Sequence, residues 1–205
     1  MCKNILICIS ISSAESIAEK NIVTTYPSVS VRELQPADVP DLLNYWFTAS
    51  DDYLHGLGVD ISRMPAKDDF RRMLELQLSV PYEQKKAYAL IWLLDNVPVG
   101  HSNLNPITFG EHAWMHLHLW SSADHGKGMA TQLIRLSLPY YFEKFQLKEI
   151  YCEPNALNPA PHRVLEKTGF VFEKEYVTVP GSINFEQPVK RWVLTVDRFK
   201  AIHQL

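Results

Sequence analysis

The sequence predicts a mixed α/β domain in which a run of antiparallel strands separates helices. An amphipathic stretch with helical period follows the first alternating segment, over residues 36–50. Two apolar runs then flank Asp95-Asn96, a hairpin signal, and a third strand-like run follows. From residue 128 onwards helical and strand-like stretches alternate. This order indicates a mixed sheet with an antiparallel meander in its middle, and it argues against a doubly wound parallel sheet.

Each element is predicted from its own pattern. Alternation of apolar and polar residues marks the strands, and apolar residues three or four apart mark the helices. In chain order we expect a strand at 28–34, a helix within 36–50, a glycine- and aspartate-rich loop at 51–65, a helix at 67–80, two strands within 87–107, a strand at 113–120, a helix from Gly128, a strand at 148–153, a helix within 160–169, and strands at 170–179 and 189–196.

Composition indicates one globular domain with a sizeable core. The chain has 205 residues, of which 46% are hydrophobic and 21% charged, with a net charge of −3. It has no basic stripe, which argues against a nucleic-acid binder. We expect an N-terminal extension over residues 1–28 and a single domain over 29–205. The cysteines (Cys2, Cys8 and Cys152) form no disulfide framework, so a reducing compartment is expected.

The N-terminal residues resemble a signal peptide only weakly. One lysine precedes a short apolar run, and Ser10, Ser12 and Ser13 dilute that run. No segment approaches the ~20 apolar residues that a membrane span requires. We therefore expect a cytoplasmic protein that binds neither nucleic acid nor a membrane.

Two glycines surround a lysine where the helix after the third central strand begins. Gly126 and Gly128 cost the first helical turn some stability, so another requirement must favour them. Amides at a helix start form an anion site, and Lys127 adds a charge. The pattern indicates a phosphate or pyrophosphate cradle, and the alternative is a plain turn. Ser121 excludes the Walker loop, and Thr131 excludes the dinucleotide fingerprint.

Two motifs resemble those of the GNAT superfamily of acetyl-CoA-dependent N-acyltransferases. The superfamily's Arg/Gln-x-x-Gly-x-Gly/Ala segment matches as His125-x-x-Gly128-x-Ala130. About 35 residues later, the stretch NPAPHRVLEKTGFVFE resembles a second block of the superfamily. The residues of this block are most similar to those of the branch that contains ribosomal-protein N-terminal acetyltransferases. The resemblance covers roughly residues 30–196.

The resemblance implies a central, mostly antiparallel twisted sheet that is splayed between its fourth and fifth strands, with helices on both faces. It implies acetyl-CoA as co-substrate and transfer of the acetyl group to a primary amine that attacks the thioester directly. Carried over onto this sequence, the pyrophosphate would lie on the amides of residues 125–131, and the pantetheine arm beside the end of the fourth strand. The implied cofactor-binding residues are Leu119, Trp120, Ser121, His125, Gly126, Lys127, Gly128, Met129, Ala130, Thr131 and Asn158.

Such a reaction needs a base to keep the amine neutral. His116 and His118 alternate with Leu117, so both imidazoles leave one face of the strand, and an unperturbed imidazole titrates near ~6.5. Glu153, at the end of the fifth strand, is the competing base. For either histidine taken singly, packing in the core or exposure to solvent is the plainer alternative.

The donor for the leaving thiolate is open. Leu165 occupies the position of the tyrosine that many superfamily members use, and Pro161 occupies that of the serine in the ribosomal branch. His162, Cys152 or water remain. The absence of both familiar acids leaves a second hypothesis, a non-catalytic acyl-CoA-binding module of the same fold.

The resemblance implies a small-molecule amine or a protein N-terminus as the acceptor. Trp46, Phe47, Tyr53 and Trp114 line its pocket or fill the core, and the acids Asp51, Asp52 and Asp60 suit a cationic amine or form a solvated loop. A homodimer is common in the superfamily.

A histidine-based metalloprotein is the third alternative. It would need a third ligand such as His112, Glu153 or Cys152 beside the His-x-His pair. Because a metal site leaves the glycines unexplained, we expect no metal.

Overall fold

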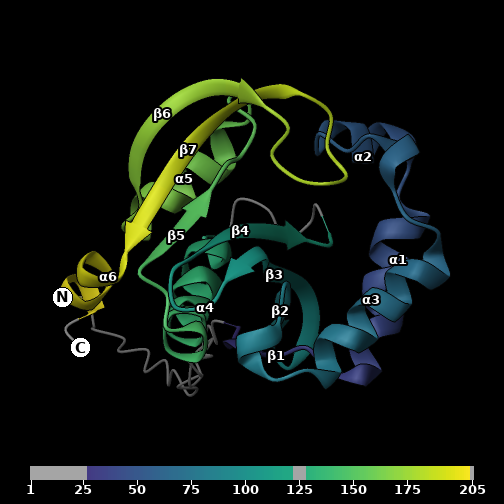
Figure 1. Cartoon of the computed structure of the whole chain (residues 1–205), viewed down its shortest axis with the longest axis horizontal. Coiled ribbons are helices and arrows are strands. Elements are labelled where there is room, and N and C mark those ends of the chain that lie inside the picture. The colour runs from purple at the N-terminus through teal and green to yellow at the C-terminus, as the bar shows by residue number, and fades with distance from the viewer. Residues whose placement is uncertain (1–26, 122–127, 204–205) are drawn as a thin grey trace, which may run out of the picture.

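The computed structural model describes residues 27–121 and 128–203 and contains one mixed sheet of seven strands, in the order β1-β2-β3-β4-β5-β7-β6 (Figure 1). All neighbouring strands run antiparallel except β4 and β5, which are parallel. The predicted mixed sheet with its antiparallel meander is confirmed. The strands are β1 (Val29–Glu33), β2 (Tyr88–Leu94), β3 (Val97–Thr108), β4 (His112–Leu119), β5 (Glu149–Cys152), β6 (Val171–Thr178) and β7 (Gln187–Thr195).

Helices cover both faces of the sheet. The α-helices are α1 (Val39–Thr48), α2 (Asp51–Gly56), α3 (Lys67–Ser79), α4 (Met129–Phe145), α5 (Pro159–Lys167) and α6 (Val196–His203). Three short 3-10 turns are η1 (Pro36–Asp38), η2 (Ile61–Arg63) and η3 (Tyr82–Gln84). No helix among the described residues is long and apolar enough to cross a membrane.

The predicted loop after α1 is wrong, and one helix was not predicted. The expected loop at 51–65 contains α2 and η2, because Ser50 caps α2 by accepting a hydrogen bond from the Tyr53 amide at 3.3 Å, and Asp60 caps η2. The final helix, α6, was not expected. Helices α2 and α6 are too short for a helical period to be recognised in the sequence.

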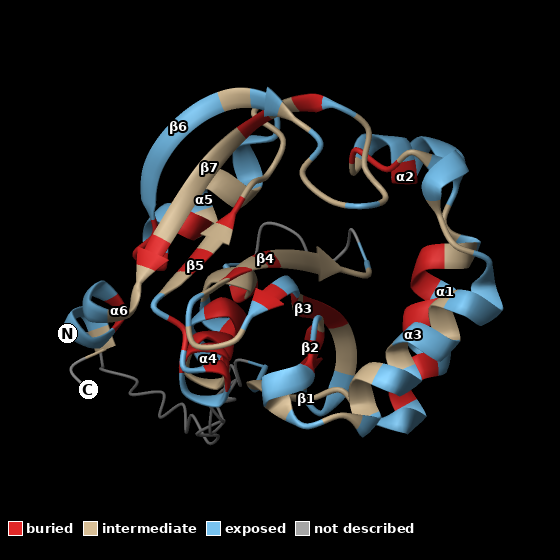
Figure 2. Ribbon diagram, viewed as in Figure 1, coloured by how far each residue is buried: buried red, intermediate tan, exposed pale blue. Residues whose placement is uncertain are grey.

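The main core lies between α4 and the sheet. Figure 2 shows the buried residues gathered on α4 and on the central strands that it covers. Trp92 of β2 is fully buried, and its indole donates to the hydroxyl of Ser137 at 3.0 Å. Ser102 of β3 lies 2.6 Å from the hydroxyl of Tyr141. These buried polar groups therefore satisfy one another and tie α4 to β2 and β3.

The opposite face of β2 packs against the N-terminal helices. Leu42 of α1 and Leu74 of α3 contact Ile91 and Leu93 of this strand. Figure 1 shows α1 and α3 side by side, at a distance from the C-terminal strands β6 and β7. The sheet face between them holds the candidate site described below.

The central hairpin forms where it was predicted. Asp95 and Asn96 have φ angles of 49° and 66°, as a tight two-residue turn between twisted strands requires. Gly100 lets β3 and β4 approach closely, because a Cβ atom there would lie 2.4 Å from the main-chain oxygen of His118. The histidines of β4 are therefore held directly against β3.

Strands β4 and β5 separate after three residue pairs. His112, Ala113 and Trp114 pair with β5, and β4 then continues to Leu119. Within the described residues, no other strand pairs with this edge of β4 beyond Trp114. This is the splay between the fourth and fifth strands that the resemblance implied.

Candidate active site

A large cleft of about 1470 Å³, hereafter the central cleft, lies over the sheet face opposite α4. Side chains of α1 and α3 form one wall, β2, β3 and β4 form its floor, and the mouth of the splay between β4 and β5 opens into it. Its floor and mouth include Asn103, His101, His116, His118, Met115, Leu117, Cys152 and Glu153.

The loop between β6 and β7 closes another side of this cleft. It forms a bridge to the segment after α2, where Val59 pairs with Asn184. The Asp60 amide donates to the Ile183 oxygen at 2.8 Å, and the Asn184 side chain donates to the Gly58 oxygen at 2.9 Å. Segments more than 120 residues apart in the chain thus meet at the rim, as the approach of the β6–β7 loop to α2 in Figure 1 shows.

His116 and His118 both face the central cleft, as their alternation predicted. Across the ladder, His116 is the partner of Asn103 and His118 the partner of His101. The Nε2 atom of His116 lies 2.9 Å from the main-chain oxygen of Asn105. Because a carbonyl only accepts, this nitrogen carries the proton, and Nδ1 of a neutral His116 keeps its lone pair.

His101 is a third histidine of this cluster, and the sequence analysis did not single it out. Its ring stacks on that of His118, with ring centres 4.7 Å apart and planes 19° apart. The indole of Trp120 donates to Nδ1 of His101 at 2.8 Å, so His101 is neutral with its proton on Nε2. The pairing of β3 with β4 brings it there.

Burial holds all three imidazoles in the neutral form. It lowers the pKa of His101 to about 3, with a smaller effect of His116. Burial also lowers the pKa of His118 well below its usual value, and His101 and His116 add to this. The pKa of His116 is lowered by burial as well, although the Asn105 oxygen and the charge of Glu153 oppose the shift. Each ring is therefore a proton acceptor at neutral pH and a poor store of positive charge.

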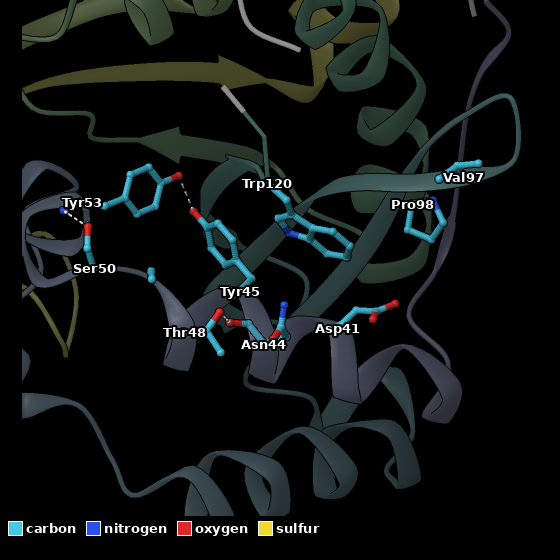
Figure 3. A pocket seen from close by; sticks show the side chains of 10 residues that line it. Asp41, Asn44, Tyr45, Thr48, Ser50, Tyr53, Val97, Pro98 and Trp120 are labelled. Carbon is cyan, nitrogen blue, oxygen red and sulfur yellow. Dashed lines mark hydrogen bonds between the residues drawn. The ribbon is translucent and has the colours of Figure 1, made fainter. Parts of the chain in front are cut away.

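A hydrogen-bonded chain leads from His118 away from the central cleft. The Tyr45 hydroxyl lies 3.1 Å from Nδ1 of His118 and 3.2 Å from the Tyr53 hydroxyl. Tyr45 comes from α1 and Tyr53 from α2. Both tyrosines line a second pocket of about 680 Å³, hereafter the side pocket (Figure 3). The chain thus joins a group on one pocket to a surface of the other.

Glu153 lies on the central cleft in an ion pair. Its Oε1 atom lies 2.5 Å from Nε of Arg191 and accepts the hydroxyl of Tyr176 at 2.6 Å. Only 6% of its side chain is exposed. The carboxylate is therefore already engaged by a cation and by a hydrogen-bond donor.

The two side chains considered as donors to the leaving thiolate are placed differently. Burial raises the pKa of the Cys152 thiol to about 12. Both nitrogens of His162 are engaged: Nδ1 accepts from the Trp192 indole at 3.0 Å, so Nε2 carries the proton and lies 3.0 Å from the Asn155 oxygen. Leu165 is fully buried in the core.

The edge of β4 presents main-chain groups toward the splay. Successive amides of a strand point to opposite edges. The Trp120 amide donates to the main-chain oxygen of Val99 in β3 at 2.9 Å. The amides of Leu117 and Leu119 therefore point to the opposite edge of β4, away from β3. Of the pantetheine residues implied by the resemblance, Leu119 is oriented for an added strand, Trp120 turns its amide to β3, and Ser121 is exposed.

The start of α4 follows a glycine in the left-handed conformation. Gly128 has a φ of 74° and provides no side-chain cap, and a Cβ atom there would meet no atom of the described residues within 4 Å. The helix continues through Met129, Ala130 and Thr131. Gly128 therefore leaves the first amides of α4 without a side-chain cap, and such amides can bind an anion. His125, Gly126 and Lys127 lie outside the described residues.

The remaining predicted residues divide between packing and the pockets. Asn158 caps α5, accepting from the Ala160 amide at 3.2 Å, and it also lines the central cleft. Trp46 lines this cleft and Tyr53 the side pocket, whereas Phe47 packs on Phe70. Trp114 packs on Tyr151 of β5.

The three loop acids line neither pocket. Asp51 and Asp52 lie in the first turn of α2, and Asp60 accepts from Ser62 and pairs with Arg63. Across residues 27–121 and 128–203, no three His, Cys, Asp or Glu side chains are grouped so as to hold a metal ion.

Comparison with known proteins gives the family. The family model described as Acetyltransferase (GNAT) domain matches residues 29–171. No curated protein matches the sequence.

Solved structures share the fold at low identity. The aminoglycoside acetyltransferase AAC(6')-Ib in complex with coenzyme A is 18% identical, with a TM-score of 0.63 over 86% of this chain and 99% of that one. The spermidine N-acetyltransferase from Vibrio cholerae, with CoA and spermine, is 20% identical, with a TM-score of 0.67 over 83% and 97%. RimL, a ribosomal L7/L12 alpha-N-protein acetyltransferase in complex with coenzyme A, is 13% identical, with a TM-score of 0.64 over 83% and 95%. The family match over most of the domain, on a sheet with the expected splay, shows that this chain belongs to the GNAT acetyltransferases.

Proposed function

We propose that this protein is an acetyl-CoA-dependent N-acetyltransferase that moves the acetyl group to a primary amine by direct attack on the thioester. One observation carries the proposal. β4 leaves β5 after Trp114, and the edge that it frees opens into a cleft whose floor carries His116 and His118. A thioester aligned on this edge would lie beside two neutral imidazoles.

The proposed cofactor site follows from the main chain. The pantetheine arm, which carries amide groups, would pair with the free edge of β4 at Leu117 and Leu119, in the manner of an added strand. The diphosphate would lie on the amides at the start of α4, beside Gly128. Asn158, on the rim of the same cleft, would contact the arm.

The amine must lose a proton as it attacks the thioester carbon. We propose His118 and His116 as the groups that accept it, in preference to Glu153. Each imidazole is neutral because burial lowers its pKa, whereas the carboxylate of Glu153 is bound to Arg191 and Tyr176. A main-chain amide on the free edge of β4 would stabilise the oxyanion.

We propose that the departing CoA thiolate takes its proton from water. A thiol ordinarily has a pKa of ~8.5. Cys152, with a pKa raised to about 12, is therefore a weaker acid than the thiol that it would have to protonate. His162 already uses its proton toward Asn155.

The charge of the central cleft favours an acceptor with one amine on an apolar body. Two carboxylates line it among the described residues, and both are engaged: Glu153 as above, and Glu33 by the Tyr82 hydroxyl at 2.9 Å. Its basic residues are Arg63, Lys85 and Lys86. Apart from Gln77, the residues that α1 and α3 contribute to the wall are apolar: Leu42, Trp46, Phe70, Met73, Leu74, Leu76 and Leu78. Such a surface offers a polycation no unpaired counter-charge.

The test combines binding with turnover. Calorimetry with CoA measures occupancy, and incubation with acetyl-CoA and a panel of amines, followed by thiol release and mass spectrometry of the product, measures transfer. Binding of CoA with amine-dependent thiol release is the expected result. Absence of CoA binding would refute the proposal, and tight binding without turnover on any amine would favour a non-catalytic acyl-CoA-binding module.

A further inference from the structure

We propose that Tyr45 and Tyr53 carry the amine's proton from His118 out of the central cleft and release it in the side pocket. The inference rests on the proposed function, since it concerns the proton that N-acetylation must remove. The hydrogen-bonded chain and the two pockets at its ends are the observations on which it stands.

The chain of three groups crosses the wall between the two pockets. His118 lines the central cleft, and Tyr45 and Tyr53 line the side pocket. The contacts are 3.1 Å from His118 Nδ1 to the Tyr45 oxygen and 3.2 Å from there to the Tyr53 oxygen. Tyr45 is 8% exposed and Tyr53 39% exposed, so the chain runs from buried to solvent-accessible groups. Figure 3 shows the two hydroxyls pointing toward each other, with Trp120 beside Tyr45.

The hydrogen bonds can be oriented for one-directional transfer. With its proton on Nδ1, His118 donates to the Tyr45 oxygen, Tyr45 donates to the Tyr53 oxygen, and Nε2 holds a lone pair. When the amine nitrogen bonds to the acetyl carbon, Nε2 takes the N–H proton. The Nδ1 proton then passes to Tyr45, the Tyr45 proton to Tyr53, and the Tyr53 proton to water. Each group ends with the number of protons that it had, and a turn of each hydroxyl and a tautomer shift reset the chain.

The surroundings of His118 favour such a route. His101 on β3 stacks on it, His116 lies two residues away on β4, and the rings of Tyr45 and Trp46 on α1 enclose it. No carboxylate contacts His118 in the described part of the chain, and burial lowers its pKa well below the usual value. An imidazolium formed there would persist only at high energetic cost, so the proton must move on as it arrives.

His116 has a different environment. Its Nε2 is directed at the Asn105 oxygen, a group that cannot accept and pass on a proton in exchange. A proton taken up at Nδ1 of His116 would therefore remain on this ring until the product left. Among the contacts of the described residues, His118 therefore has a path by which a proton can leave, and His116 has none.

The packing of Tyr45 calls for substitutions that keep the rings. Tyr45 contacts Trp46, Tyr53, His101, His118 and Trp120 through its ring. Tyr45→Phe and Tyr53→Phe remove only the hydroxyls. Tyr151→Phe is the matched control, because its hydroxyl also bonds to a side chain, the carboxylate of Glu149, and Tyr151 lines neither pocket.

The test measures steady-state thiol release by the full-length protein with the best amine of the panel. We expect Y45F and Y53F to lower kcat about tenfold, a part of the ~10²–10⁴-fold that acid–base groups contribute, with KM for acetyl-CoA unchanged. Added imidazole buffer should restore Y53F toward the wild-type rate in a concentration-dependent way, since a small base entering the side pocket replaces the missing hydroxyl. Y151F should match the wild type with and without the buffer.

The outcomes separate this inference from the proposed function. An active wild type, with Y45F and Y53F indistinguishable from Y151F, overturns the relay and leaves acetyl transfer standing. A loss of kcat in Y53F that no buffer restores also overturns it, because a structural role would give that result. An inactive wild type overturns acetyl transfer and the relay together. Tyr53 is partly exposed, so Y53F keeps the test valid even where Y45F fails to fold.

Discussion

The rings of His101 and His118 stack face to face across the β3–β4 ladder, with centres 4.7 Å apart. Two imidazolium rings in this arrangement would repel each other, and burial disfavours a charge on either ring, so the neutral pair is the stable one. The same contact therefore affects both the folding of the domain and the pH range over which His118 acts as a base.

The folded domain should lose stability as the pH falls below 7. In the unfolded chain His101 binds a proton near pH ~6.5, whereas in the folded state burial lowers its pKa to about 3. Between these two pKa values the unfolded state thus binds more protons than the folded state. The free energy of unfolding therefore decreases as the pH is lowered through that range. At pH 5 the cost from His101 is about 2 kcal/mol. Urea unfolding at pH 7 and pH 5 measures it.

The matched variants for this measurement are His101→Gln and His112→Gln. Glutamine retains an acceptor for the Trp120 indole but does not titrate. The free energy of unfolding of H101Q should therefore differ between pH 7 and pH 5 by about 2 kcal/mol less than that of the wild type. H112Q, the same change elsewhere in the sheet, should retain it. Equal pH dependence in H101Q and the wild type would show that His101 does not stay neutral in the folded protein.

The acid limb of turnover should lie below pH 6.5. Because burial lowers the pKa of both His116 and His118, the base form is present down to pH values at which an exposed histidine would be protonated. We expect kcat, at saturating amine, to stay level from pH 8 to pH 6.5 and to decline only at lower pH. A limb centred at or above pH 6.5 would contradict a buried histidine base.

Glu153→Gln distinguishes the two histidines. The charge of Glu153 raises the pKa of His116, and it has no such effect on that of His118. If His118 is the base, as the relay requires, E153Q leaves the acid limb where it is. If His116 were the base, the loss of the charge would lower its pKa and move the limb to lower pH. The pH profile of kcat for the two proteins decides between them.

Local patterns predicted most of the fold and part of the site. The Asp95-Asn96 turn, the start of α4 and the alternation of His116 with His118 are all short-range features. The register between β3 and β4 is not short-range. It shifts between Leu104 and Ile107, and this irregularity determines that His101 lies opposite His118. No count of residues from the turns would have placed that pair.

The state of Glu153 could not be predicted for a similar reason. Its partner Arg191 lies 38 residues later, on a strand that reaches β5 only through the order β5-β7-β6. From the sequence alone, Glu153 is therefore expected to be an available base, whereas in the fold it is paired with Arg191. Tyr45, which contacts His118, is hidden in the same way within the apolar face of α1.

The acceptor preference should follow the charge of the central cleft. We expect kcat/KM for an arylalkyl monoamine to exceed that for spermidine or kanamycin at least tenfold, because both lining carboxylates are already engaged. Met73, an exposed residue of α3 that lines the cleft, offers a site for adding a charge. M73E should raise kcat/KM for spermidine severalfold, and M73Q should not. A wild type that prefers the polyamine would refute the proposed acceptor class.

Gly128→Ala should weaken CoA binding, and Gly110→Ala should not. Both glycines have φ near +75°, and no atom of residues 27–121 or 128–203 lies within 4 Å of a Cβ atom placed there, so alanine strains the backbone of each by about 1–2 kcal/mol. Gly128 begins α4, whereas the Gly110 amide donates to the oxygen of Phe145 at the other end of that helix. If the amides at the start of α4 hold the diphosphate, calorimetry should show about a fivefold higher Kd for CoA in G128A, equivalent to ~1 kcal/mol. Because the backbone strain is shared, an equal loss of affinity in both variants would mean that strain, and not a lost anion site, explains the change.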